Sequence, residues 1–455
     1  MIMHFPLKQR LALIAVLVIP SLLVWKSNPS LWIPAVPFFI LLGGSQVAIG
    51  VFFPTIITLA GFCLFLFYAA GTILRNRPLP SLPLSVKLVL LAFLVQVVSI
   101  TISIHIHGQF FWNAVREGST IFLFMPFIFI IPDLCNTDNK LQRLGRSIAL
   151  ALLFASILGV AEYFSISGFS RIDMALGYVY KGRVGSFLYS PNVFSGYLEL
   201  TVPLSIALGM WEKSLTWKIV SFSAAALGVL SVLFTFSRGG LMSVTLGCAI
   251  VMVYRFRKRI WIPILMGLLF AGVLVKYADV FERQMSFFAN PAELMHQPTL
   301  LHRYITYKGF YREFLESPLT GTGWGSKPHY WGRTRLYSFW EVRHTVSTDH
   351  MKQFGGLNNL ILTHAVRGGL VGLGALFLVL LSAAMVSFSA YKRVPRPWGI
   401  GIAAGFIGFF THQTMDNFLK WNQTSCLFWL LMGIAIAAVK ISQTKATLLN
   451  DVSGK

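Results

Sequence analysis

Apolar runs of about 18 to 25 residues recur along the whole chain, and they restrict its fold more than any other feature. Each run is long enough to cross the roughly 30 Å hydrocarbon layer of a membrane as a helix. A transmembrane barrel would alternate apolar with polar residues, and these runs do not. Only 12% of the residues are charged, against about 25% in a soluble domain. The sequence therefore predicts an all-α integral membrane protein.

The basic residues give a formal net charge of +22, and most of them lie in short connections between the apolar runs. This is the pattern of a membrane protein whose basic connections remain in the cytoplasm. No compact basic domain is present that would bind nucleic acid. The four cysteines lie in or beside apolar runs without metal-ligand spacing. They predict neither a disulfide framework nor a metal site.

Placing the basic connections in the cytoplasm predicts about twelve crossings, with both termini inside. The predicted crossings are residues 11–25, 48–73, 86–104, 118–132, 147–165, 193–210, 217–236, 240–254, 260–276, 358–390, 398–414 and 424–440. The short proline-containing piece 31–44 is predicted to be re-entrant or interfacial, because a further crossing would break the inside–outside alternation. The chain then divides into four parts. These are N-terminal membrane helices (1–277), one large periplasmic loop (278–356), C-terminal membrane helices (357–441) and a cytoplasmic tail (442–455).

The predicted topology places the most notable polar residues on one face of the membrane. Arg183, Arg238, Arg303 and His350 all fall on the non-cytoplasmic side. Within the large loop, the spacing of aromatic residues from Thr306 to Leu315 is typical of an amphipathic helix at the membrane surface.

Arg238 and Arg303 are the main candidates for binding an anion. Arg238 follows an apolar helix directly, and an arginine at that depth is costly unless it is paired or faces a wet cavity. Gly239 and Gly240 would let backbone amides approach an anion closely. A guanidinium binds diphosphate oxygens through two nitrogens, which suits both arginines. The alternatives are an Arg238 that reaches a lipid headgroup and an Arg303 that is simply exposed in the loop.

Further candidates come from the two polar intervals. Arg183 and Lys181 are predicted diphosphate ligands, whereas Asn192 is explained equally well as part of a helix start. His350 and His344 are candidate general bases, since histidine titrates near neutral pH. Sugar-stacking platforms, or alternatively an interfacial aromatic belt, are predicted for three further residues: Trp324, Tyr330 and Trp331. The glycine run PLTGTGWGS lacks the lysine and the preceding strand of a nucleotide loop.

Four motifs in order resemble the O-antigen ligase and polymerase superfamily of bacterial membrane proteins. They are GRVGSFLYSPNVFSGYLELTVPL, FTFSRGGLMSV, HRYITYKGFYREFLESPLTGTGWG and LNNLILTHAVRGGLVG. The resemblance covers roughly residues 147 to 440. By similarity, Arg238 and Arg303 match arginines associated with the lipid diphosphate, and Arg183 and Asn192 match the earlier periplasmic motif.

The resemblance implies a lipid-dependent, GT-C-like glycosyltransferase of the bacterial inner membrane with a large periplasmic loop. Such enzymes move a glycan from undecaprenyl diphosphate to an acceptor, with inversion and without a metal or other cofactor. The implied partners are the lipid-linked oligosaccharide, an acceptor glycan or lipid A core, membrane lipids, a chain-length regulator and a flippase.

This chain departs from the ligases at the end of the loop. Ligases of this family typically carry His-Asn where the chain has Asn358-Asn359, and an acidic residue where it has Arg367. His350 lies several residues too early to replace that histidine. The interpretation is therefore a surface-polysaccharide polymerase, with an O-antigen ligase as the close alternative. A transporter of lipid-linked glycans is the second alternative, although the scarcity of mid-helix charges and the lack of an internal repeat speak against it.

Overall fold

The computed structural model describes residues 33–42, 82–164, 183–188, 190–262, 309–326, 359–394 and 397–453, together with a few isolated residues between 264 and 307. Every regular element in these residues is a helix. The longer ones are α4 (Leu84–His105), α5 (Phe111–Ser119), α6 (Phe127–Leu134), α7 (Asp138–Tyr163), α9 (Pro191–Trp211), α10 (Leu215–Phe234), α11 (Arg238–Arg255), α17 (Leu360–Arg393), α18 (Pro397–Gln413) and α19 (Asn422–Ser453). The prediction of an all-helical chain holds for the described residues.

Seven segments of the described chain are long and apolar enough to cross a membrane. They are Leu84–His105, Phe111–Leu134, Asp138–Tyr163, Pro191–Trp211, Leu215–Phe234, Leu360–Arg393 and Asn422–Thr447. The predicted crossings 240–254 and 398–414 are also helical, as α11 and α18, but these helices have only 18 and 17 residues and are not among the seven. The predicted crossings 11–25, 48–73 and most of 260–276 lie outside the described residues. The protein is thus a multi-pass membrane protein, and the total of twelve crossings stays a prediction.

Helix α4 shows how this bundle suits lipid rather than water. Its buried residues include Gln96, Ser99 and Ser103, whereas Leu94 and Val98 are exposed. A helix with apolar residues outside and small polar residues inside would be unstable on a protein surface in water. In a bilayer it is the expected arrangement, because small and polar side chains hold helices together there.

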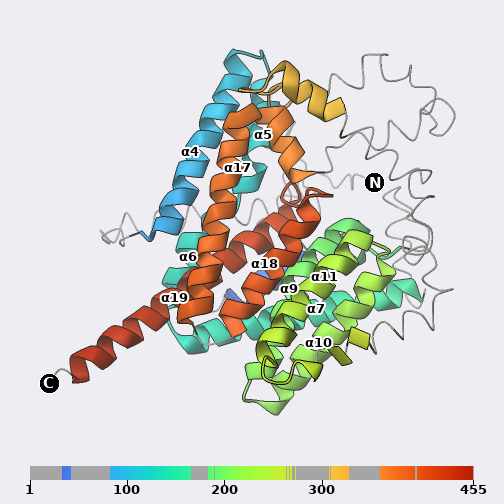
Figure 1. Cartoon of the computed structure of the whole chain (residues 1–455), viewed down its shortest axis with the longest axis vertical. Coiled ribbons are helices and arrows are strands. Elements are labelled where there is room, and N and C mark those ends of the chain that lie inside the picture. The colour runs from blue at the N-terminus through green and yellow to red at the C-terminus, as the bar shows by residue number, and fades with distance from the viewer. Residues whose placement is uncertain are drawn as a thin grey trace, which may run out of the picture.

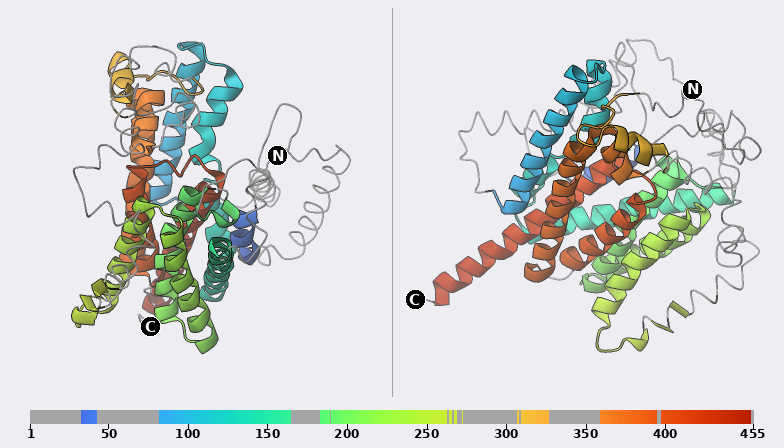
Figure 2. Two further views of the ribbon diagram at one scale, coloured as in Figure 1. Left: turned by 90° about the vertical axis from the view of Figure 1, so that its right-hand side faces the viewer. Right: turned by 45° about the horizontal axis from the view of Figure 1, so that its top comes forward.

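The helices pack into two groups that meet along α17, α18 and α19. Helix α17 packs against α4 and α18, and α19 packs against α6, while α18 packs against α9 and α11 and α10 packs against α7 and α9 (Figure 1). Helix α9 is almost entirely buried within this arrangement. Helix α19 continues beyond the bundle to Ser453, so the predicted tail begins as an extension of this helix (Figure 2).

The piece predicted not to cross the membrane contains a short helix, α2 (Val36–Leu42), which packs against α7 and α19. Ile40 and Leu41 are fully buried there. Seven residues of helix span about 10 Å, far less than the hydrocarbon layer. The described part of this piece is consistent with a re-entrant or interfacial segment.

Side-chain caps fix where three of the long helices begin. Thr137, Ser237 and Asn359 each accept a backbone N–H from the first turn of α7, α11 and α17, respectively. Such caps stabilise a helix start by about 1 kcal/mol. The caps of α11 and α17 lie at the same end of the bundle, where the candidate site is found.

Glu212 fixes the opposite end of the bundle, where α9 turns into α10. Its carboxylate accepts bonds from Arg146 Nε and Nη2, both at 3.0 Å, and from the Lys213 N–H at 2.8 Å. Burial acts to raise the pKa of Glu212, but hydrogen bonds from Arg146, Ser214, Lys213 and Gln142 outweigh it and lower this pKa to about 2. The contribution of Glu212 to stability is therefore complete above its usual pKa and is lost as the pH falls toward 2.

We expect Glu212→Gln to lower the unfolding temperature by several degrees at pH 7, because a charged acceptor of several hydrogen bonds is removed. The difference from the wild type should shrink as the pH falls below about 4.5. Thermal unfolding of the detergent-purified wild type and variant, at pH 7 and at a pH below about 4.5, measures this difference. Glu316→Gln is the control, since Glu316 is exposed. An equal loss from both variants would contradict the prediction.

Candidate functional site

Arg183 and Asn192 lie together beside the turn between α10 and α11. Arg183 donates from Nε to the Thr235 carbonyl and from Nη2 to Asn192 Oδ1, both at 2.8 Å. Asn192 Nδ2 donates in turn to Asp416 Oδ2 at 3.0 Å. We call these four residues the Arg183 network. It joins the start of α9, the end of α10 and the turn between α18 and α19.

Arg238 is the first residue of α11, directly after this network. Thr235 ends α10, Phe236 has a left-handed backbone with φ 50°, and the Ser237 side chain caps α11 by accepting the Gly240 N–H. A left-handed conformation is uncommon for a phenylalanine and is found where the surrounding structure enforces it. The turn reverses the chain within three residues, and it places Arg238 at a helix N-terminus, where backbone N–H groups favour anions.

A buried histidine, paired with a buried glutamate, packs against the start of α11. His412 Nδ1 lies 2.6 Å from Glu199 Oε1, and both side chains are almost completely buried. A methyl group added at Gly239 would lie 2.3 Å from His412 Nε2, so the imidazole packs directly on the glycine after Arg238. Gly240 packs equally closely on Ser195. Both glycines are needed for close helix packing, which adds a structural reason to their predicted role in binding an anion.

Glu199, His412 and Asp416 were not among the predicted site residues. Glu199 interrupts the apolar run of α9, and a carboxylate inside a membrane span is functional by default. That signal was available in the sequence. The pairing of Glu199 with His412, which is 213 residues away, depends on the contact between α9 and α18.

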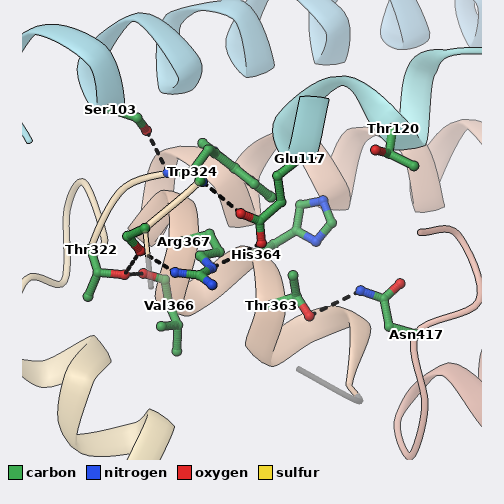
Figure 3. Close-up of polar contacts among 12 residues, drawn as sticks. Ser103, Glu117, Thr120, Thr322, Trp324, Thr363, His364, Val366, Arg367 and Asn417 are labelled. Carbon is green, nitrogen blue, oxygen red and sulfur yellow. Dashed lines mark hydrogen bonds and ion pairs between the residues drawn. The ribbon is translucent and has the colours of Figure 1, made fainter. Parts of the chain in front are cut away.

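A second polar cluster surrounds Arg367 at the same end of the bundle (Figure 3). Arg367 Nε donates to Glu117 Oε1 at 3.1 Å, and its Nη1 donates to Ser326. Glu117 also accepts the Gly325 N–H at 2.6 Å. The arginine that replaces the acidic residue of the ligases is therefore paired with a carboxylate from α5. Arg367 is buried and Glu117 is half-buried, so the pair holds α5 and α17 together at the edge of the bundle.

The glycine run at 321–325 packs against a break in α17. Gly369 has φ 58° and ψ −151°, which interrupts the helix. The backbone groups exposed by this break pair with the loop: Thr322 and Gly323 donate to the Val366 and Arg367 carbonyls at 2.7 and 3.1 Å, and Leu370 donates to the Pro318 carbonyl at 2.8 Å. Gly321 also has a positive φ, and a side chain there would collide with the α17 backbone. Irregular backbone at this depth is tolerated because the protein itself satisfies it.

Trp324 is neither an exposed surface for sugar stacking nor part of an interfacial belt. Its side chain is 2% exposed, and its indole N–H donates to Ser99 Oγ at 2.9 Å. It packs edge-on against His364 and forms part of a cavity wall. In the predicted amphipathic segment, residues 309–316 are helical, with Phe310 buried and Tyr311 exposed.

The turn between α18 and α19 separates the two clusters. Asp416 accepts a hydrogen bond from Asn192. The next residue, Asn417, donates to Thr363 Oγ1 at 3.1 Å, and Thr363 lies one turn before Arg367 on α17. Lys420 lies between the two clusters: burial lowers its pKa, and the nearby carboxylates of Asp416 and Glu117 counteract this effect. The two clusters thus form one polar region at one end of the bundle.

The remaining predicted site residues lie outside the described part of the chain. They are Lys181, Arg303, Tyr330, Trp331, His344 and His350. Their roles stay predictions. Within the described residues, no three His, Cys, Asp or Glu side chains gather as a metal site would require.

The fold and these clusters define a multi-pass membrane protein with a polar, arginine-containing site at one end of its helix bundle. Residues 223–377 match the family model described as O-Antigen ligase. This range includes the end of α10, the whole of α11 and the first half of α17. The match confirms the predicted resemblance to the O-antigen ligase and polymerase superfamily over these residues. No curated protein matches the chain.

Proposed function

We propose that the protein is a polymerase-type glycosyltransferase of bacterial surface polysaccharide assembly. It moves a glycan from undecaprenyl diphosphate to a sugar hydroxyl at the periplasmic face of the inner membrane. The observation that carries this proposal is the placement of Arg183 by Asn192 and the Thr235 carbonyl beside the N-terminus of α11, where Arg238 begins the helix. Two arginines and a helix N-terminus close to one another suit a diphosphate.

In the proposed reaction, the acceptor hydroxyl oxygen attacks the anomeric carbon of the lipid-linked sugar. The bond between this carbon and the diphosphate oxygen breaks, and its electron pair stays on the diphosphate. The arginines stabilise the charge that develops on the leaving group. The hydroxyl proton passes to a base, for which His350 is the first candidate and His344 the second. Holding two lipid-anchored substrates together supplies a further part of the rate enhancement.

The ligase alternative differs in the acceptor, which would be lipid A core. Asn359 caps α17 by accepting the Leu362 N–H at 3.0 Å. The residue before it, Asn358, stands where ligases of this family typically carry a histidine. We favour the polymerase for this reason. Expression in cells that lack each activity separates the two: lengthened undecaprenyl-linked glycan supports a polymerase, and glycan on lipid A core supports a ligase.

The transporter alternative gains one observation, the buried Glu199–His412 pair within the helices, because such pairs also occur in proton relays. Extension of a radiolabelled lipid-linked glycan in purified proteoliposomes, with no nucleotide sugar added, distinguishes an enzyme from a transporter. Movement of the labelled lipid across the membrane without extension would support the transporter.

Arg303→Lys is expected to lower this chain extension about a hundredfold, because lysine cannot bind two diphosphate oxygens through a planar fork. Arg312→Lys is the matched control, since Arg312 lies in the same loop and is exposed. Full extension by the Arg303 variant in proteoliposomes would remove Arg303 from the proposed site.

A further inference from the structure

A cavity of about 200 Å³ opens between α5, the start of α17 and the turn between α18 and α19. Its wall includes Glu117, Thr120, Trp324, Arg367, Asn417 and Lys420. The cavity is far larger than the space needed for one water molecule, so it can hold a small polar ligand such as one sugar ring. It is smaller than the pockets of about 300 to 1,000 Å³ that hold drug-sized ligands.

Asn417 presents a buried hydrogen-bond acceptor at this cavity. The residue is 3% exposed, and its Nδ2 donates to Thr363 Oγ1 at 3.1 Å. Its Oδ1 has no hydrogen-bond partner among the residues that the structure describes. Figure 3 shows this oxygen pointing away from Thr363. A buried polar atom is normally paired, so an unpaired acceptor in a cavity wall points to a ligand that donates to it.

The chemistry of the wall matches a polyhydroxylated ring. Glu117 offers a carboxylate acceptor, Asn417 an amide acceptor and Lys420 an ammonium donor. A sugar hydroxyl both donates and accepts, so it can bond with each of these polar groups. An apolar chain would leave Asn417 Oδ1 without a hydrogen bond, which is costly. A diphosphate in this cavity would be repelled by the negative charge of the Glu117 carboxylate.

We propose that this cavity is a subsite for one sugar ring of a glycan substrate, and that Asn417 Oδ1 accepts a hydrogen bond from a ring hydroxyl. The inference rests on the proposed glycan transfer, and it adds the place where a sugar is held. Because Asp416 belongs to the Arg183 network and Asn417 lines the cavity, one short turn holds the two sites next to each other. A ring bound here lies close to the diphosphate of the donor.

Filling the cavity tests this proposal. Thr120 lines the cavity, and among the described residues its hydroxyl bonds to the Arg116 carbonyl one turn earlier. Thr120→Met places a larger apolar side chain in the cavity without removing a contact between helices. Thr101→Met is the matched control, because Thr101 makes the same bond to the Val97 carbonyl and is exposed on α4. Asn417→Leu keeps the branching of the side chain and removes the acceptor, together with the bond to Thr363.

The first measurement uses a panel of methyl pyranosides, neutral and acidic, as probes. Saturation-transfer NMR on the detergent-purified protein should show binding to the wild type and to Thr101→Met. The signal should fall about tenfold or more for Thr120→Met and for Asn417→Leu. Equal signals from all four proteins, or no pyranoside binding to the wild type, would overturn the subsite.

The second measurement separates this inference from the proposed function. Undecaprenyl diphosphate should raise the unfolding temperature of Thr120→Met as much as that of the wild type, because the filled cavity is not the diphosphate site. Pyranoside binding without any stabilisation by undecaprenyl diphosphate would retain the subsite and contradict the diphosphate site. Stabilisation by undecaprenyl diphosphate together with unchanged pyranoside binding in Thr120→Met would retain the diphosphate site and contradict the subsite.

The source of the ring, donor or acceptor, follows from kinetics with labelled lipid-linked donor and free glycan acceptor in proteoliposomes. Thr120→Met should raise the KM for one of the two substrates about tenfold, with kcat little changed. The substrate whose KM rises is the one that occupies the cavity. An unchanged KM for both would overturn the subsite.

Discussion

Arg183→Lys should reduce glycan transfer about a hundredfold while leaving the protein folded. Arg183 bonds to the Thr235 carbonyl through Nε and to Asn192 through Nη2, two directions that a single ammonium cannot reproduce. The variant keeps the positive charge but loses the fixed position of that charge, and transition-state stabilisation by a positioned donor is worth about a hundredfold or more. Chain extension in proteoliposomes measures the effect.

Arg146→Lys is a matched control for this substitution. Arg146 also bonds through Nε and Nη2, to Glu212, but it lies at the opposite end of the bundle. The control should lower the unfolding temperature and retain transfer, whereas Arg183→Lys should lose transfer. A similar loss of transfer in both variants would show that the effect is a general loss of structure.

Gly239→Ala should have a comparably large effect on transfer. An added methyl group would lie 2.3 Å from His412 Nε2, a distance at which the imidazole or the start of α11 must move. His412 is held by Glu199 at 2.6 Å and is buried, so it has little room to move. Displacement of α11 would shift Arg238, and we expect about a hundredfold loss of transfer, because small misplacements at a reaction centre are costly.

Gly374→Ala is the control for Gly239→Ala. Gly374 lies within α17, and an added methyl group would meet no atom within 4 Å. Alanine also favours the helix over glycine by about 1 kcal/mol. This variant should keep full transfer and an equal or higher unfolding temperature. Normal transfer by Gly239→Ala would mean that the packing of His412 on α11 has no part in the reaction.

The sequence predicted the helices well because their signal is local. Nine predicted crossings coincide with described helices, since apolar length and basic connections are read from neighbouring residues alone. Charge bias also predicted that Arg183 and Arg238 lie at the same end, and the Arg183–Thr235 bond shows that they do. The sequence did not indicate how the helices pair, because a polar stripe such as that of α4 shows which side is buried but not which helix covers it.

The parts of the site that were missed depend on that pairing. Asp416 and Asn417 form an unremarkable polar turn in the sequence, and only the packing of α18 against α9 and α17 gives each a partner. Trp324 was considered together with exposed aromatics, because a tryptophan in a polar loop does not reveal that the loop folds back onto α4. The sequence also carried no sign that the glycine run pairs with the break in α17, because Gly369 is 46 residues from the middle of the run.

The break at Gly369 has a consequence for the order in which the chain assembles. The segment that pairs with it, from Pro318 to Gly323, precedes α17 and is synthesised before that helix leaves the ribosome. Helix α17 therefore enters the membrane after its hydrogen-bonding partner has been made. A circular permutation that moved this segment behind α17 would reverse the order. The backbone N–H and C=O groups at the break would then lie unpaired in the bilayer until the segment was synthesised.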